Sequence, residues 1–202
     1  MSAAVQKRPR PPRSKNAERF RGIVRDIAEM AHHAVDAPLL DENERETPAS
    51  VFNTLNVEFD FTLDVAASHQ NHKLPRYCTH LGRFDNGAAI SHLDGLSGEV
   101  WAGERVWCNP PYTDLHLWVS LAWHANADVA VVLLPNNRAE QPFWQDLIEP
   151  YRDRPGSVLT TRNLAKRRPF GRRVNGELVM GKSPPFGLVV AIWDRRNPLI
   201  PF

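Results

Sequence analysis

The segment "ADVAVVLLP", residues 127–135, decides the fold of this chain. After Asp128 its aliphatic and β-branched residues follow one another without a polar interruption. A strand that other elements cover on both faces has this composition, because neither face meets water. The segment therefore predicts a strand that is buried on both sides.

Segments on either side of this run complete an α/β pattern. Further strands are predicted at 59–68, ending near Asp64, at 105–109 and at 186–194. Apolar residues at helical spacing predict helices over 17–34, over a short segment with Thr47 as N-cap before Pro48, over 114–125 and over 139–150. Strands that alternate with helices are typical of an α/β fold with a largely parallel sheet.

The 202 residues are enough for one domain with appendages. Residues 1–16 are rich in Pro and Arg and are predicted to be a disordered basic arm, and 17–202 are predicted to form a single domain. Residues 151–185 are basic and rich in Gly and Pro, which predicts an irregular excursion before the last strand.

Composition excludes several classes of protein. No apolar run approaches the ~20 residues of a membrane-spanning helix, and the N-terminus lacks an apolar signal-peptide core. Two cysteines, Cys78 and Cys108, are too few for a disulfide framework. A cytoplasmic location is the expectation.

The net charge of +2 conceals two basic clusters. One lies within 7–25, and the other lies in the excursion at Arg162, Lys166, Arg167, Arg168, Arg172 and Arg173. Such clusters suit a polyanion such as nucleic acid, and the excursion is where contacts with a DNA backbone are expected. A solvated tail and a solvated loop would have the same composition, so charge alone leaves both interpretations open.

Three predicted strands end in unusual residues: Asp64, the sequence 109–112, and the sequence 135–138. In open α/β sheets, ligands bind outside the carboxyl ends of the strands. A ligand site is therefore expected where these ends converge.

The most informative of the three ends is Asn109-Pro110-Pro111-Tyr112. The two prolines fix the backbone, so that the carboxamide oxygen of Asn109 and the carbonyl of Pro110 form a rigid pair of acceptors beside the flat ring of Tyr112. This set suits a planar substrate with an NH₂ group, and acceptance of both hydrogens favours the nucleophilic form of the nitrogen. The other interpretation is a strand stop in which Tyr112 fills a gap.

Asn-Pro-Pro-Tyr in this context resembles motif IV of the amino-group methyltransferases that use S-adenosylmethionine. The wider chain resembles the phage-type (Dam-like) DNA N6-adenine methyltransferases over 47–193. The matching segments are "TPASVFNTLNVEFDFTLDVAAS" at 47–68, Asn71, "YCT" at 77–79, "DGL" at 94–96, Trp101, "VWCNPPYTD" at 106–114, Trp118, "VVLLP" at 131–135 and "SPPFGLVVAIW" at 183–193.

The resemblance implies a Rossmann-like methyltransferase fold, with a mostly parallel sheet flanked by helices. It implies direct transfer of a methyl group from S-adenosyl-L-methionine to N6 of an adenine flipped out of double-stranded DNA, without a metal. Asn109 and Pro110 would bind the amine, with Pro111 completing the motif, and Tyr112 would stack on the base. The residues implied at the cofactor are Thr47, Pro48, Asp64, Ala66 and Asp94.

The sequence "LDVAAS" at 63–68 lacks the glycines that many methyltransferases have after the first strand. This departure leaves room for a DNA-binding decoy that has lost its cofactor. Methyltransferases of RNA or of protein glutamine share Asn-Pro-Pro-Tyr, and cytosine-N4 enzymes more often have Ser in place of Asn109. His69, His72, Cys78 and His80 are of types that bind zinc, but their spacing favours structural or loop roles.

Overall fold

The computed structural model describes residues 46–68, 70–79, 94–174 and 177–197. The expected basic arm at 1–16 and the expected helix at 17–34 lie outside the described residues. The helical elements are α2 (Ala49–Phe59), the 3₁₀ helix η2 (Gly98–Trp101), α3 (Leu115–His124) and α4 (Pro142–Leu147). The strands are β1 (Leu63–Asp64), β2 (Arg105–Cys108), β3 (Val129–Pro135), β4 (Leu159–Asn163), β5 (Gly171–Val174), β6 (Glu177–Met180) and β7 (Leu188–Asp194).

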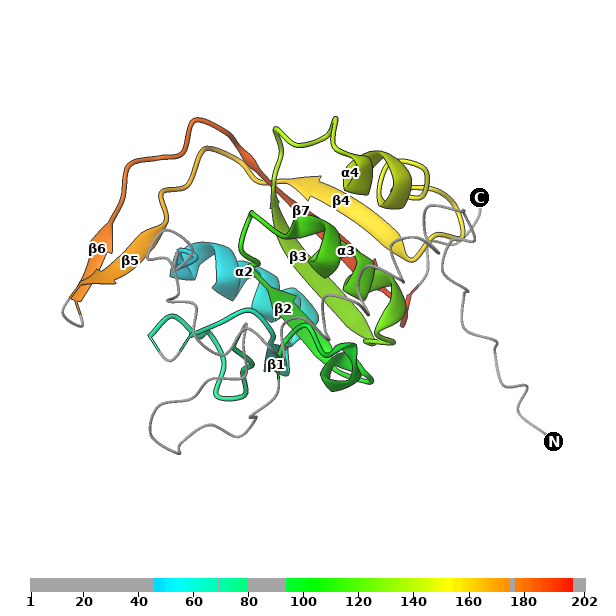
Figure 1. Ribbon diagram of the computed structural model, residues 1–202, viewed down its shortest axis with the longest axis horizontal. Coiled ribbons are helices and arrows are strands. Elements are labelled where there is room, and N and C mark those ends of the chain that lie inside the picture. Colours follow the sequence, from blue (N-terminus) through cyan, green and yellow to red (C-terminus); the bar gives the residue numbers. More distant parts are fainter. Residues whose placement is uncertain (1–45, 69, 80–93, 175–176, 198–202) are drawn as a thin grey trace.

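Five of these strands form one sheet in the order β1-β2-β3-β7-β4 (Figure 1). β1, β2 and β3 pair in parallel, as the α/β pattern predicts. β7 runs antiparallel to β3 over all seven residues and antiparallel to β4 as well, so the last strand is reversed within an otherwise parallel sheet. The fold is thus a mixed α/β fold with a mostly parallel sheet, and the reversed strand is a feature that the sequence pattern does not reveal.

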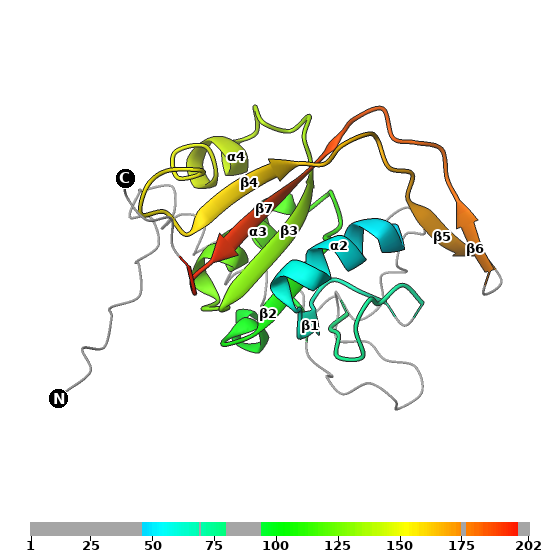
Figure 2. The same ribbon diagram turned by 180° about the vertical axis from the view of Figure 1, so that it is seen from behind.

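Every residue of β3 is buried, which confirms the prediction drawn from "ADVAVVLLP". Its side chains alternate between two cores. Ala130, Val132 and Leu134 pack with α3 and α4 on one face. Val131 and Leu133 pack with α2 on the other face. Figures 1 and 2 show α2 and α3 on opposite sides of the sheet, so helices exclude water from both faces of β3.

Three expectations about local structure need correction. The helix near residue 47 begins at Ala49 with Pro48 as its N-cap, so Thr47 is not the cap. α2 continues to Phe59, where Asp60 takes a left-handed conformation and ends it, and only Leu63–Asp64 remains as a strand. The helix expected at 139–150 is confined to α4.

The segment 151–185 is not irregular, since it contains β4, β5 and β6. β4 joins the main sheet through β7, whereas β5 and β6 form a separate antiparallel hairpin. Figures 1 and 2 both show this hairpin projecting beyond the sheet. Residues 159–163 have only a weak strand pattern in the sequence, and they form a strand because they pair with β7.

In the part of the chain that the structure describes, no helix combines the length and the apolar character that crossing a membrane requires.

Arg195, just after β7, joins the end of the sheet to the end of α3. Its guanidinium donates to the carbonyls of Ala127 (3.0 Å), Ala122 (2.7 Å) and Trp123 (2.9 Å). The last carbonyls of a helix have no partner within the helix, and a cation at this end is also favoured by the helix dipole.

Replacement of Arg195 by Met is expected to lower the free energy of unfolding by about 1.5–3 kcal/mol, because these carbonyls lose a charged donor. Urea unfolding measures the change. The matched control is Arg196→Met, since Arg196 is exposed and pairs with Asp194 at the surface. This control is expected to cost about 1 kcal/mol or less. Equal losses in both variants would contradict the role of Arg195.

Candidate functional site

The parallel pairing of β1, β2 and β3 brings the three unusual strand ends to one edge of the sheet. Asp64 lies opposite Trp107, and Cys108 lies opposite Val132. Asn109 therefore follows the last paired residue of β2 and lies beside the end of β1. Asn136, after β3, has a structural role there, because its backbone and side chain both bond to the backbone of Gly187 (3.0 and 3.1 Å).

Two isolated bridges continue this edge beyond β1. Asp64 bridges to Tyr77 and Thr79 bridges to Asp94, both in parallel. The amide of Cys78 donates to the carbonyl of Asp64 (2.7 Å), and the amide of Gly95 donates to the carbonyl of Thr79 (3.1 Å). Asp94 is consequently held at the same edge as Asp64, although they are thirty residues apart in sequence.

The "DGL" turn packs tightly against the turn after β1. A Cβ atom at Gly95 would overlap the carbonyl oxygen of Val65, so a side chain at this position would push the two turns apart. Asp94 is half-buried, and its Oδ1 accepts from the amide of Leu96 (2.9 Å). The glycine of "DGL" thus serves the close approach of two backbones at the candidate site.

Asp64 is buried, with 2% of its surface exposed. Its carboxylate accepts from the backbone amides of Lys73 (2.9 Å) and Ala66 (3.4 Å). Burial raises the pKa of Asp64 from 3.8 to about 6, and the two amides and the Lys73 charge oppose that rise. Burial, together with the Asp64 charge, also raises the pKa of the Cys108 thiol.

The amides of the turn after β1 are all engaged within the fold. Val65 donates to Trp107 (3.0 Å), Ala66 to the Asp64 side chain, and Ala67 to Cys78 (3.0 Å). A ligand at this edge therefore meets side chains and carbonyls there instead of a row of free amides. The small side chain of Ala66 is half-buried and leaves the backbone close to the surface.

Sequence reasoning missed a buried ion pair beside Asp64. Lys73 Nζ lies 2.8 Å from Glu46 Oε1, and the two side chains are only 11% and 10% exposed. Glu46 also exchanges two backbone hydrogen bonds with Gly171 (2.8 and 3.0 Å). The pair joins the segment before Thr47-Pro48, the loop after β1 and the start of the β5–β6 hairpin. Glu46 is the last residue of the acidic sequence "DENERE" at 41–46, and no spacing in the sequence pairs it with Lys73.

Thr47 is buried next to this pair, and Pro48 caps α2. A series of contacts connects the cofactor residues that the resemblance implies. Thr47 and Pro48 directly follow Glu46, and Glu46 pairs with Lys73. The backbone amide of Lys73 in turn donates to Asp64. Asp94 joins them through the bridges described above.

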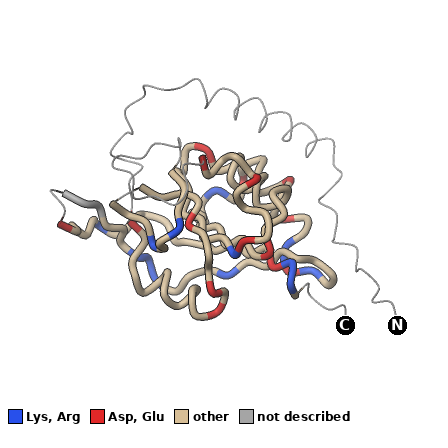
Figure 3. Tube along the Cα trace, turned by 90° about the horizontal axis from the view of Figure 1, so that it is seen from below, with Lys and Arg blue, Asp and Glu red and all other residues tan. Residues whose placement is uncertain are grey.

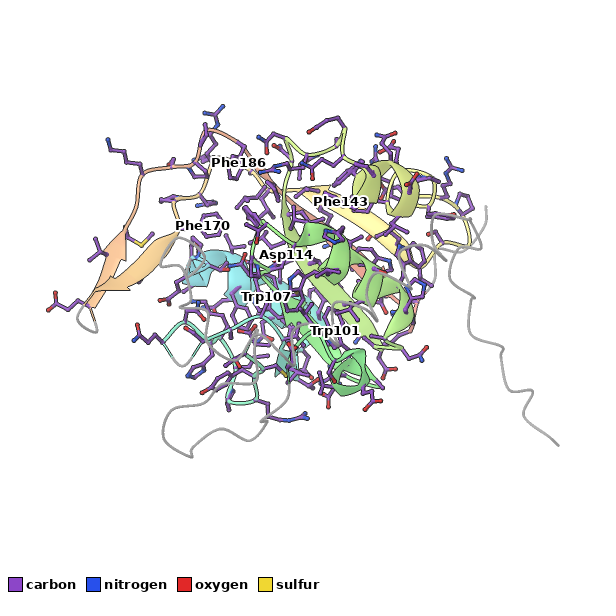
Figure 4. The ribbon with its side chains drawn as sticks, in the orientation of Figure 1. Trp101, Trp107, Asp114, Phe143, Phe170 and Phe186 are labelled. Carbon is purple, nitrogen blue, oxygen red and sulfur yellow. The ribbon has the colours of Figure 1, made fainter. Side chains whose placement is uncertain are left out.

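Asn109-Pro110-Pro111-Tyr112 occupies the edge directly after β2. Pro110 is buried, and Asn109, Pro111 and Tyr112 are half-buried. The ring of Tyr112 contacts Phe170 at 6.4 Å and 82° and Phe186 at 6.1 Å and 57°. Neither contact is a parallel stack. Figure 4 shows Phe170 and Phe186 on the two segments that lead to and from the hairpin.

The basic residues of the excursion fall into two groups. Arg162, on β4, forms a two-pronged ion pair with Glu58 (2.6 and 2.7 Å) and lies 5.7 Å from the Phe59 ring, so its charge is satisfied by α2. Lys166 and Arg167 are exposed and Arg168 is half-buried, while Arg172 and Arg173 lie on β5. Figure 3 shows Lys and Arg positions along this projecting part of the chain.

Of the four residues considered for zinc at 69–80, two belong to the described residues. His72 stacks on Tyr77 (4.3 Å, 6°) and its ring bonds to the carbonyl of Leu74 (2.9 Å), while Cys78 is buried. His69 and His80 lie outside the described residues. Among the residues described, no group of His, Cys, Asp or Glu has the arrangement of a metal site.

The fold and the site define an α/β protein that presents Asn-Pro-Pro-Tyr at the carboxyl edge of parallel strands. Residues 37–149 match the family described as DNA N-6-adenine-methyltransferase (Dam). The match spans more than half of the 202 residues, and the chain belongs to this family, as its resemblance predicted. A search of curated proteins found no similar protein.

The pKa of Asp64 gives a prediction about stability. Between about pH 4 and pH 6 the native state keeps a proton that the unfolded state releases, so the contribution of Asp64 to the unfolding free energy falls as the pH rises. The quantity to compare is the unfolding free energy of wild type minus that of Asp64→Asn. From pH 4 to pH 7 this difference is expected to fall by on the order of 3 kcal/mol. Urea unfolding at a series of pH values measures it, and a difference independent of pH would contradict the prediction.

The Lys73–Glu46 pair gives a second prediction. Lys73→Met leaves a buried carboxylate without this cation and is expected to cost about 3 kcal/mol of unfolding free energy. Arg76→Met is the control, since Arg76 pairs with Glu104 (2.8 Å) while 48% of its side chain is exposed, and about 1 kcal/mol or less is expected. Adding Glu46→Gln to Lys73→Met should recover part of the loss. Equal costs for Lys73 and Arg76 would show that burial of the pair has no consequence.

Proposed function

We propose that this protein is an S-adenosyl-L-methionine-dependent methyltransferase that acts on N6 of an adenine flipped out of double-stranded DNA. Membership of the Dam family supports the chemistry. The observation that carries the proposal is the position of Asn109-Pro110-Pro111-Tyr112 beside the Asp64–Asp94 edge, where the ends of parallel strands meet. The proposal includes a Rossmann-like sheet, for which the parallel strands β1, β2 and β3 are the support.

In this proposal the acceptors of Asn109 and Pro110 hold the two hydrogens of the adenine amine. Their fixed positions after a buried strand favour the pyramidal nitrogen, whose lone pair is free to attack. Tyr112 stacks on the flipped base, and Phe170 and Phe186 hold its ring in place. The chain contributes mainly orientation, by keeping the amine at one place and angle.

The residues of the edge fit the proposed cofactor through their side chains. S-adenosylmethionine supplies an electrophilic methyl group when bound. Asp94 offers a half-buried carboxylate to hydroxyl or amine donors, and the small Ala66 allows close approach of a ligand. Asp64, which is buried and binds two amides, acts by shaping the turn between them. Thr47 and Pro48 directly follow Glu46, whose ion pair with Lys73 supports a role for this segment near Asp64.

The lack of glycine after β1 is compatible with this arrangement, because the amides of residues 65–67 already have partners within the fold. A glycine-rich turn exposes amides to a ligand, whereas this turn uses them to hold β1, β2 and the loop at 76–79 together. Cofactor recognition therefore falls to Asp94, Ala66 and the segment at 47–48.

Asn109→Ala tests the proposed function. The purified protein is incubated with double-stranded DNA and labelled S-adenosylmethionine, and the DNA nucleosides are separated by mass. N6-methyladenine is expected with wild type, and about 100-fold less or lower with Asn109→Ala, because a preorganised acceptor is lost. Asn53→Ala, at an exposed position of α2, is the control and should retain full activity.

Parallel reactions with RNA and with protein distinguish the other acceptors of the methyl group. A folded wild type that leaves every DNA adenine unmodified would overturn the proposal. Calorimetric titration with S-adenosylmethionine then separates a decoy, which binds DNA but no cofactor, from an enzyme with another substrate. Sequencing of methylated DNA from an otherwise unmethylated host identifies the target sequence.

A further inference from the structure

The β5–β6 hairpin lies beyond the matched span of 37–149 and carries an unusual surface. Four large apolar side chains are exposed among the described residues, and three of them are consecutive on β6: Leu178 (47%), Val179 (44%) and Met180 (50%). A two-stranded hairpin in water is marginally stable at best. Successive side chains of a strand point to opposite faces, so Leu178 and Met180 share one face, where both lie near Gly171, and Val179 lies on the other. An exposed apolar face of this kind is typical of a surface that a partner covers.

The charge around the hairpin identifies the kind of partner. Residues 164–182 contain six basic residues, Lys166, Arg167, Arg168, Arg172, Arg173 and Lys182, and one acid, Glu177. A second copy of this chain would bring two such basic surfaces together, which their mutual repulsion opposes. A polyanion with an apolar interior, such as duplex DNA with its stacked bases, complements both properties.

The base of the hairpin is fixed beside the proposed adenine site. Phe170 directly precedes β5, Phe186 follows β6, and both contact the ring of Tyr112. The amide of Gly181 donates to the carbonyl of Phe170 (2.9 Å), and Gly171 bonds to Glu46 in both directions. The hairpin is therefore anchored at its base, and DNA whose adenine reaches Tyr112 must pass close to it.

The dimensions of the hairpin agree with this partner. The two strands of a hairpin lie about 4.8 Å apart, and the major groove of B-DNA is about 12 Å wide and 8.5 Å deep. A two-stranded ribbon fits into such a groove. Apolar side chains that contact unstacked bases cover apolar surface that would otherwise meet water, and this offsets part of the cost of unstacking.

We propose that the β5–β6 hairpin enters the major groove of duplex DNA, where Leu178 and Met180, which share one face of β6, contact the bases that lose stacking when the target adenine leaves the helix. Lys166, Arg167 and Arg168 hold the phosphates on the flank, and Arg162 takes no part because Glu58 pairs with it. The inference rests on the proposed function for the identity of the partner.

Two variants of the full chain separate the apolar contact from the phosphate contacts. The apolar variant is Leu178→Ser with Met180→Ser, both at exposed positions on one face of β6. The basic variant is Lys166→Gln with Arg167→Gln and Arg168→Gln. Binding is measured by fluorescence anisotropy on labelled duplexes that present adenine in every two-base context. Each duplex is prepared both as a perfect duplex and with adenine opposite adenine.

The apolar variant is expected to bind perfect duplexes about tenfold more weakly than wild type. On mismatched duplexes it should recover most of this loss, since their bases are already unstacked. The basic variant should lose affinity equally on both and show a weaker dependence on salt. An unchanged thermal unfolding midpoint in both variants excludes loss of folding as the cause.

Wild-type affinity in the apolar variant, or an equal loss on perfect and mismatched duplexes, would overturn the inference. So would a sedimentation experiment in which wild type is a dimer and the apolar variant a monomer with unchanged affinity for DNA. The binding assay does not require methylation. If the variants bind DNA as expected but wild type methylates no adenine, only the proposed chemistry is overturned. If wild type methylates adenine but the variants bind in the contrary pattern, only the hairpin inference is overturned.

Discussion

Parallel pairing of β1 with β2 is the interaction on which the site depends. It aligns Leu63 with Val106 and Asp64 with Trp107, so that Asn109 leaves the sheet beside the turn that follows Asp64. A shift of one residue would move every side chain of β2 to the opposite face. Trp107, which is buried between Phe52 and Phe61 on the α2 side, opposes such a shift. The hydrophobic core thus sets the register, and the register sets where the polar motif lies.

A second constraint is the buried polar network around Lys73. Its amide binds Asp64 and its ammonium binds Glu46, whose backbone in turn binds Gly171. Three segments that are far apart in the sequence therefore meet through one lysine. Because the same network touches the proposed cofactor edge and the base of the hairpin, it provides a physical connection between the two.

The sequence allowed much of the core to be predicted, because its strong patterns come from burial. The strands predicted at 127–135 and 186–194 and the helix predicted at 114–125 correspond to β3, β7 and α3, with bounds that differ by one or two residues. Prediction was poorest where local signals compete. Phe59 and Phe61 alternate with polar residues as in a strand, but Phe59 is the last residue of the helix α2 and the strand begins only at Leu63. The hairpin was missed although Asn175-Gly176 is a dipeptide typical of hairpins, since the Gly, Pro and basic residues of 151–185 suggested an irregular excursion.

By itself the sequence determined the α/β class, the buried central strand and the Asn-Pro-Pro-Tyr motif at a strand end, because these are properties of contiguous residues. Tertiary structure alone decided the reversal of β7, the engagement of the turn amides after β1, the pairing of Arg162 with Glu58 and the contact of Lys73 with Glu46. Each of these interactions joins residues that no periodic pattern in the sequence relates to one another. The physical reason is that a polar group taken out of water needs a partner, and the fold, not the neighbouring sequence, determines which group is within reach.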